Sequence, residues 1–118
     1  MDDNIVVDIT LETNIAVVAF QNASISNSEA IAEAAAQIKD FIARKHPSRI
    51  VFDFGSVRFF SSQVLGLLLD IRSILEGEGE VVISAIEPKL YRVFKITNLD
   101  KIFRFFPDKQ SAVEEVRN

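Results

Sequence analysis

Residues 49–75, RIVFDFGSVRFFSSQVLGLLLDIRSIL, decide the fold of this chain. Residues 50–54 form a short apolar run rich in β-branched and aromatic side chains, which is typical of a buried strand. Residues 64–75 carry more apolar positions than an exposed helix would have, so we expect a buried helix there. The first turn of that helix is predicted to begin at Ser61 and Ser62.

The two serines come at a point where a side-chain hydroxyl has a local role. The first N–H groups of a helix lack partners within the helix, and a serine hydroxyl can accept a hydrogen bond from one of them. One serine is enough for this, and the same helix end favours a phosphate dianion. We expect Ser61 to be the cap. For Ser62 two interpretations stay open, a helix cap and a phosphorylated residue.

Composition limits what the rest of the chain can do. The 118 residues suffice for a single domain, residues 1–118, and 48% hydrophobic with 25% charged residues is ordinary for a compact globular protein. The absence of cysteine excludes disulfides, thiolate nucleophiles and cysteine-based metal sites. With an acidic start and no apolar run of about 18 residues, we expect a soluble cytoplasmic protein without membrane contact.

The overall charge points to the class of partner. A formal net charge of −4, without a cluster of lysines and arginines, argues against nucleic acid. Protein partners are therefore expected. No motif indicates a metal or a cofactor.

The segment before the central stretch predicts a hairpin and a helix. Residues 5–12 alternate apolar and polar side chains, and residues 15–20 form a second apolar run after a short turn. Residues 21–27 are polar and small, as in a loop. A helix with one apolar stripe is then expected to begin with Ser26 or Asn27 as its cap and to run to Lys45.

The segment after the central stretch alternates strands and helices again. We expect a turn at residues 76–80, a buried strand at 81–86, a helix starting at Glu87 and Pro88, a short strand at 102–106, and a terminal helix. The predicted fold is α/β, with a mixed sheet of four to five strands flanked by about four helices.

With this order in place, the chain resembles the STAS family, the bacterial anti-sigma factor antagonists and their relatives, over nearly its whole length. The family carries a motif Asp-Ser-x-Gly-Leu-Gly after a buried strand, and residues 61–66 here read SSQVLG. Ser62 falls on the serine that a partner kinase, itself an anti-sigma factor, phosphorylates in the family. Residues 87–94 and 96–103 look like the family's third helix and the approach to its last strand.

The resemblance implies a regulator, not an enzyme, that is a monomer or a weak homodimer. It would bind an anti-sigma factor and serine kinase while Ser62 is unmodified, and release it when Ser62 is phosphorylated; a phosphatase would reverse the change. The expected docking surface lies at the start of the central helix and in the loop at residues 22–26. Its residues are Phe60, Ser61, Ser62, Gln63, Val64, Asn22 and Ser24.

Departures from the family motif motivate a second hypothesis. Ser61 stands where the family has aspartate, Val64 where it has the first glycine, and residues 21–24 replace a Gly-x-x-Asp loop. A kinase that reads the acidic residue would meet a different surface here. The alternative is therefore a constitutive interaction subunit of a larger signalling or transport assembly, without a phosphorylation switch.

Four further residues could have a structural or a functional role. We expect Phe59 and Phe60 to divide between the core and the surface, where an exposed phenylalanine would anchor a partner. Asp53 lies in an apolar strand, either as a buried acid or base or as a hydrogen-bonded residue at the strand end. His46 is expected to be a solvated loop residue. A small enzyme would need Asp53 and His46 close together.

Overall fold

The computed structural model describes residues 4–75 and 79–117 and contains the predicted mixed sheet. Its strand order is β1-β2-β4-β6-β7; β1 and β2 are antiparallel, and all other neighbours are parallel. The bounds are β1 Val7–Glu12, β2 Ile15–Phe20, β4 Arg49–Asp53, β6 Glu80–Ser84 and β7 Arg104–Phe106. Residues 76–78 of the predicted turn lie outside the described residues.

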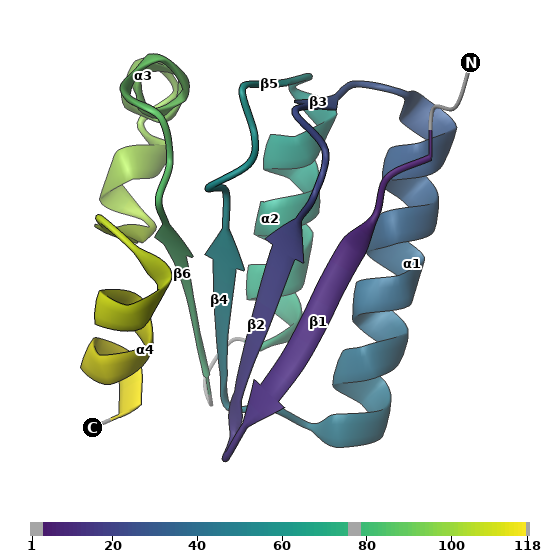
Figure 1. Cartoon of the computed structure of the whole chain (residues 1–118), viewed down its shortest axis with the longest axis vertical. Helices are drawn as coiled ribbons and strands as arrows, with labels where there is room; N and C mark the ends of the chain where they lie inside the picture. The colour runs from purple at the N-terminus through teal and green to yellow at the C-terminus, as the bar shows by residue number, and fades with distance from the viewer. Residues whose placement is uncertain (1–3, 76–78, 118) are drawn as a thin grey trace.

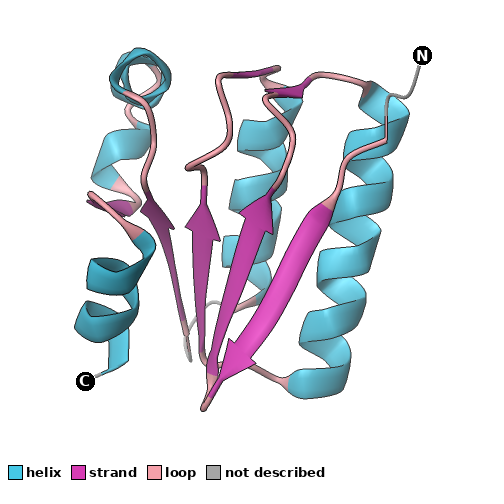
Figure 2. Ribbon diagram, in the orientation of Figure 1, coloured by secondary structure: helices cyan, strands magenta, loops and turns pink. Residues whose placement is uncertain are grey.

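In the described part of the chain, four helices and one short 3-10 helix flank the sheet (Figure 2). They are α1 Ser28–Lys45, α2 Gln63–Ile74, α3 Pro88–Ile96, η1 Leu99–Lys101 and α4 Lys109–Arg117. Figure 1 shows α1 and α2 on one face of the sheet, α4 on the other, and α3 beyond the ends of the strands. Within the described part of the chain, no helix is long and apolar enough to cross a membrane.

Both faces of the central strands are covered, which explains their continuous apolar runs. In β2, Ala16 and Val18 face the larger core beneath α1 and α2, whereas Ile15 and Val17 face the smaller core beneath α4. Side chains on successive residues of a strand point to opposite faces, so a strand covered on both sides has no polar face.

The first helix begins and ends where its sequence predicts. Asn27 is the cap, and its Oδ1 accepts a hydrogen bond from the Ala30 N–H at 2.9 Å. At the other end His46 is left-handed, with φ 49°, and its N–H donates to the Ile42 carbonyl. Pro47 follows and cannot continue the helix.

A chain of phenylalanine rings fills the larger core near the carboxyl ends of the strands. Ring centroids are 5.4 Å apart for Phe20 and Phe54, 5.8 Å for Phe54 and Phe60, and 6.0 Å for Phe60 and Phe94. The planes are tilted or perpendicular, which suits the quadrupoles of the rings. The rings connect β2, the end of β4, the segment before α2, and α3, so they fix this end of the molecule.

The prediction of a loop at residues 21–27 is partly wrong, because this segment contains a short strand. β3 (Ser24–Ile25) pairs in parallel with β5 (Phe59–Phe60) in a separate two-stranded sheet. The Ala23 carbonyl also accepts hydrogen bonds from the N–H groups of Arg58 and Phe59, at 2.7 and 3.0 Å. This small sheet stands beyond the carboxyl ends of β2 and β4 (Figure 1).

Candidate functional site

Ser62 lies at the start of α2 and its side chain is exposed. It occupies the cap position, yet its side chain makes no capping hydrogen bond, and its backbone is already near-helical at φ −61° and ψ −18°. The Val64 and Leu65 N–H groups instead donate to the carbonyls of Ser61 and Ser62, each at 3.0 Å. The interpretation of the Ser62 hydroxyl as a helix cap is therefore wrong, and this hydroxyl is not used to close the helix.

Ser61 was expected to be the cap, and this is also wrong. Its Oγ is buried and has no hydrogen-bond partner among the described residues. Its backbone N–H donates to the Ile25 carbonyl at 3.0 Å, which ties the start of α2 to β3. Ser61 therefore positions its neighbour through the backbone.

Two residues of the expected docking surface are buried. Phe60 is only 6% exposed and Val64 is fully buried, so neither side chain can contact a partner. Phe60 packs its ring against Phe54 and Phe94. The predicted division of the phenylalanines is confirmed, but Phe59, at 54% exposed, is the one on the surface.

Three other predicted residues lie near the surface with different roles. Ser24 is exposed on β3, and Gln63 is exposed while its Nε2 donates to the Ser28 carbonyl at 3.1 Å. Asn22 is half-buried and engaged within the fold: its Oδ1 accepts from the Val6 N–H at 2.8 Å, and its Nδ2 donates to a backbone carbonyl at 2.9 Å. Asn22 thus fastens the loop to the chain ahead of β1. The exposed group that we name the switch surface consists of Ser24, Phe59, Ser62 and Gln63.

Sequence reasoning missed an ion pair beside the switch surface. Arg58 Nη1 donates to Glu87 Oε2 at 3.0 Å, and the Arg58 side chain is 71% exposed. Glu87 is the residue that precedes α3, so the pair joins the β5 segment to the start of α3. The two residues are far apart in sequence, and no local pattern could have paired them.

The sequence model of the STAS domain family matches residues 5–112. The chain belongs to the STAS domain family. An anti-sigma factor antagonist from Mycobacterium paratuberculosis is 24% identical with a TM-score of 0.86, covering 100% of this chain and 98% of that one. An anti-sigma-factor antagonist (STAS) domain protein from Planctomyces limnophilus is 18% identical with a TM-score of 0.83, covering 93% and 96%. The predicted STAS fold is thus confirmed.

A third solved structure connects the fold with phosphorylation in another protein. The Bacillus cell fate determinant SpoIIAA in its phosphorylated form is 21% identical to this STAS domain, with a TM-score of 0.73. The match covers 94% of this chain and 99% of that one. At this identity the likeness shows a shared fold.

The two residues of the enzyme hypothesis lie at opposite ends of β4. Asp53 is the last residue of that strand, and its Oδ1 accepts a hydrogen bond from the buried Ser84 hydroxyl at 3.0 Å. His46 is exposed at the end of α1, just before the strand begins at Arg49. The strand alone spans roughly 13 Å at its usual rise per residue. The STAS domain therefore does not bring these two groups together.

Proposed function

We propose that this STAS domain is an anti-sigma factor antagonist in the cytoplasm, a regulator and not an enzyme. In this proposal it binds an anti-sigma factor that is also a serine kinase, and phosphorylation of Ser62 releases that partner. The observation that carries the proposal is the exposed Ser62, whose side chain does not cap α2. The fold shared with anti-sigma factor antagonists supports it.

The position of Ser62 suits a reversible modification. A phosphate adds roughly −1.5 to −2 charges at the start of α2, where the helix dipole favours an anion. The added group would not displace a capping hydrogen bond, because Ser62 makes none. The modification would therefore leave the fold intact and change only the surface that a partner meets. A phosphatase would restore the binding state.

Phe59 is the candidate anchor for the partner. Its backbone N–H is bonded to Ala23 at 3.0 Å, while its ring is about half exposed. An aromatic side chain on a fixed backbone loses little conformational entropy on binding, and such residues dominate interface energies. Phe59 is three residues before Ser62, so one partner would contact both.

One observation favours the constitutive subunit as a second candidate. Ser61 replaces the family's aspartate, and its Oγ is buried, so no acidic group precedes Ser62 on the surface. A kinase that recognises its substrate through such an acidic group would not find that group here. A constitutive subunit would dock through the same switch surface without modification.

The two candidates are separated by capturing partners from the native cell extract. The immobilised baits are the wild type, Ser62→Ala, Ser62→Asp and the control Ser73→Asp, which adds the same charge at the other end of α2. Bound proteins are identified by mass spectrometry. We expect an anti-sigma-type kinase on every bait except Ser62→Asp. Capture of the same proteins by all four baits would contradict the switch and favour the constitutive subunit.

A further inference from the structure

Charge is unevenly distributed over the molecule. Three segments meet at the carboxyl ends of the parallel strands, where β3, β5 and α3 lie in Figure 1: residues 21–28, 54–63 and 88–99, which we name the carboxyl edge. The segments themselves contain no aspartate or glutamate; the acidic residues directly beside them in the sequence are Glu29, Asp53, Glu87 and Asp100, of which Glu87 pairs with Arg58. The charged residues within the segments are Arg58, Lys89, Arg92 and Lys95.

The outer face of α3 combines these cations with an exposed apolar side chain. Leu90 and Phe94 are buried, and the helical spacing puts Lys89, Arg92 and Ile96 on the side away from them. Ile96 is 74% exposed, more than any other large hydrophobic residue in the described part of the chain. Within the same residues, no ion pair involves the cations of α3.

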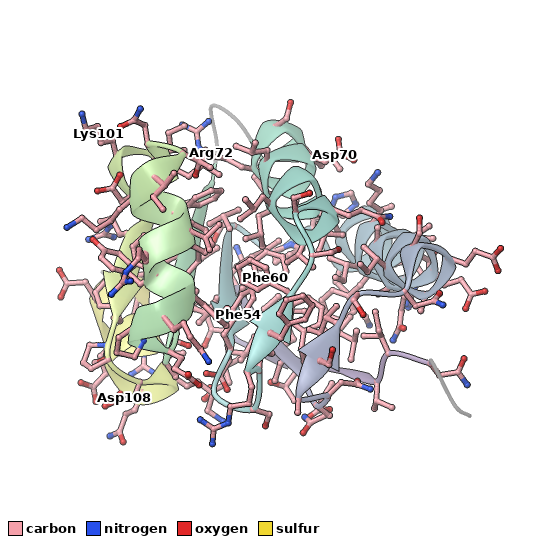
Figure 3. All side chains as sticks on the ribbon, turned by 90° about the horizontal axis from the view of Figure 1, so that it is seen from above. Phe54, Phe60, Asp70, Arg72, Lys101 and Asp108 are labelled. Carbon is pink, nitrogen blue, oxygen red and sulfur yellow. The ribbon has the colours of Figure 1, made fainter. Side chains whose placement is uncertain are left out.

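The face of α3 is continuous with the switch surface. The ion pair between Arg58 and Glu87 joins the residue before Phe59 to the residue before α3. Figure 3, which looks onto this end of the molecule, shows α3 beside the segment that carries Phe60. A partner seated on Phe59 would therefore also meet α3.

We propose that the carboxyl edge docks an acidic surface of the partner, with Lys89, Arg92 and Lys95 as charged contacts and Ile96 as an apolar contact. This proposal rests on the proposed function for the identity of the partner, and it adds that the partner's docking surface is acidic. Unpaired cations around an exposed apolar residue complement carboxylates around an apolar patch. This chemistry also explains the direction of the switch, because an acidic partner is repelled by a phosphate on Ser62, whereas a basic partner would be attracted.

An anionic membrane has a related chemistry, and the observations favour a protein. The cations are continuous with the switch surface, which in the proposed function faces a protein. An anionic bilayer would also repel the rest of the chain, because the net charge of the chain is −4. A protein can confine its acidic surface to the carboxyl edge alone.

The test compares two double charge reversals of equal size. Lys89→Glu with Arg92→Glu changes the face of α3, and the control Lys45→Glu with Arg117→Glu changes the last turns of α1 and α4, at the opposite end of the molecule (Figure 1). Association and dissociation rates are measured with the purified protein that the wild type captures, at about 50 and about 200 mM salt. Circular dichroism confirms that each variant is folded, and Ser62→Asp is run in parallel.

We expect the α3 reversal to lower the association rate about tenfold at low salt, with a smaller effect at high salt and little effect from the control. Equal losses in both variants, or no loss in the α3 variant, would overturn the proposal. The wild type and the α3 variant are also tested on phosphatidylcholine vesicles with about one third phosphatidylglycerol. If only the wild type binds these vesicles while both proteins bind the partner equally, the cations serve a membrane instead. If Ser62→Asp binds like the wild type, the switch fails, and the α3 result still reports the partner's charge.

Discussion

The starts of α1 and α2 lie at the same end of the molecule and are built differently (Figure 1). At α1, Asn27 accepts a hydrogen bond from the Ala30 N–H at 2.9 Å, so its side chain closes the helix. At α2, Ser62 occupies the same position and makes no such bond. A side chain therefore closes the start of α1, whereas the start of α2 has no side-chain cap from Ser62 and packs through buried residues such as Val64 and Leu65.

The largest expected effect tests whether the core holds the start of α2. Phe60→Ala should lower the free energy of unfolding by about 3–5 kcal/mol, because the ring is 6% exposed and packs against Phe54 and Phe94. The matched change Phe59→Ala should cost only about 1 kcal/mol, since Phe59 is 54% exposed. Urea unfolding of both variants measures the two values.

The same pair separates stability from binding. Phe59→Ala should weaken the captured partner's binding about tenfold or more, although the domain stays folded. Equal stability losses in the two variants would contradict the assignment of Phe60 to the core and Phe59 to the surface.

The second-largest expected effect compares the stability lost at Asn27 and at Ser62, the residues at the two cap positions. Asn27→Ala should destabilise the domain by about 1 kcal/mol, because it removes a capping hydrogen bond. Ser62→Ala should change stability by at most about 0.3 kcal/mol, because no such bond is lost. Thermal and urea unfolding provide the comparison, and a loss of about 1 kcal/mol in Ser62→Ala would show that its hydroxyl is a cap after all.

The sequence predicts the positions of both helix starts, but it predicts the capping hydrogen bond only at the first, for a physical reason. Asn27 precedes a long helix with one apolar stripe, so local spacing is enough to place the cap. The start of α2 is set by contacts with β3, a strand of two residues that no periodic pattern can reveal. Phe60 was assigned to the surface for the same reason, since two residues of strand do not fix which one points inward.

The smallest expected effect concerns the buried hydroxyl next to the switch. Ser61→Ala should stabilise the domain by about 0.5 kcal/mol, because the Ser61 Oγ is buried without a partner in the described residues. Ser24→Ala, at an exposed position on the neighbouring strand, is the control and should leave stability unchanged. A clear destabilisation by Ser61→Ala would contradict this expectation and mean that the hydroxyl makes a hydrogen bond in solution.

The family resemblance predicted the overall fold, and the spacing of apolar residues predicted the main strands; the role of Ser62 stays a prediction. Neither could indicate the ion pair of Arg58 with Glu87, or that Arg58 and the cations of α3 lie at the same end of the molecule. Both features arise only when segments that are distant in sequence come together.

The switch is tested best by comparing the affinity of the captured partner for the domain with phosphoserine at position 62 and for the unmodified domain. Isothermal titration calorimetry on both forms gives the ratio. Binding should be at least about 100-fold weaker for the phosphorylated form, because a dianion would face an acidic partner surface. Affinities that agree within about twofold would rule out the phosphorylation switch and leave a STAS domain that binds constitutively.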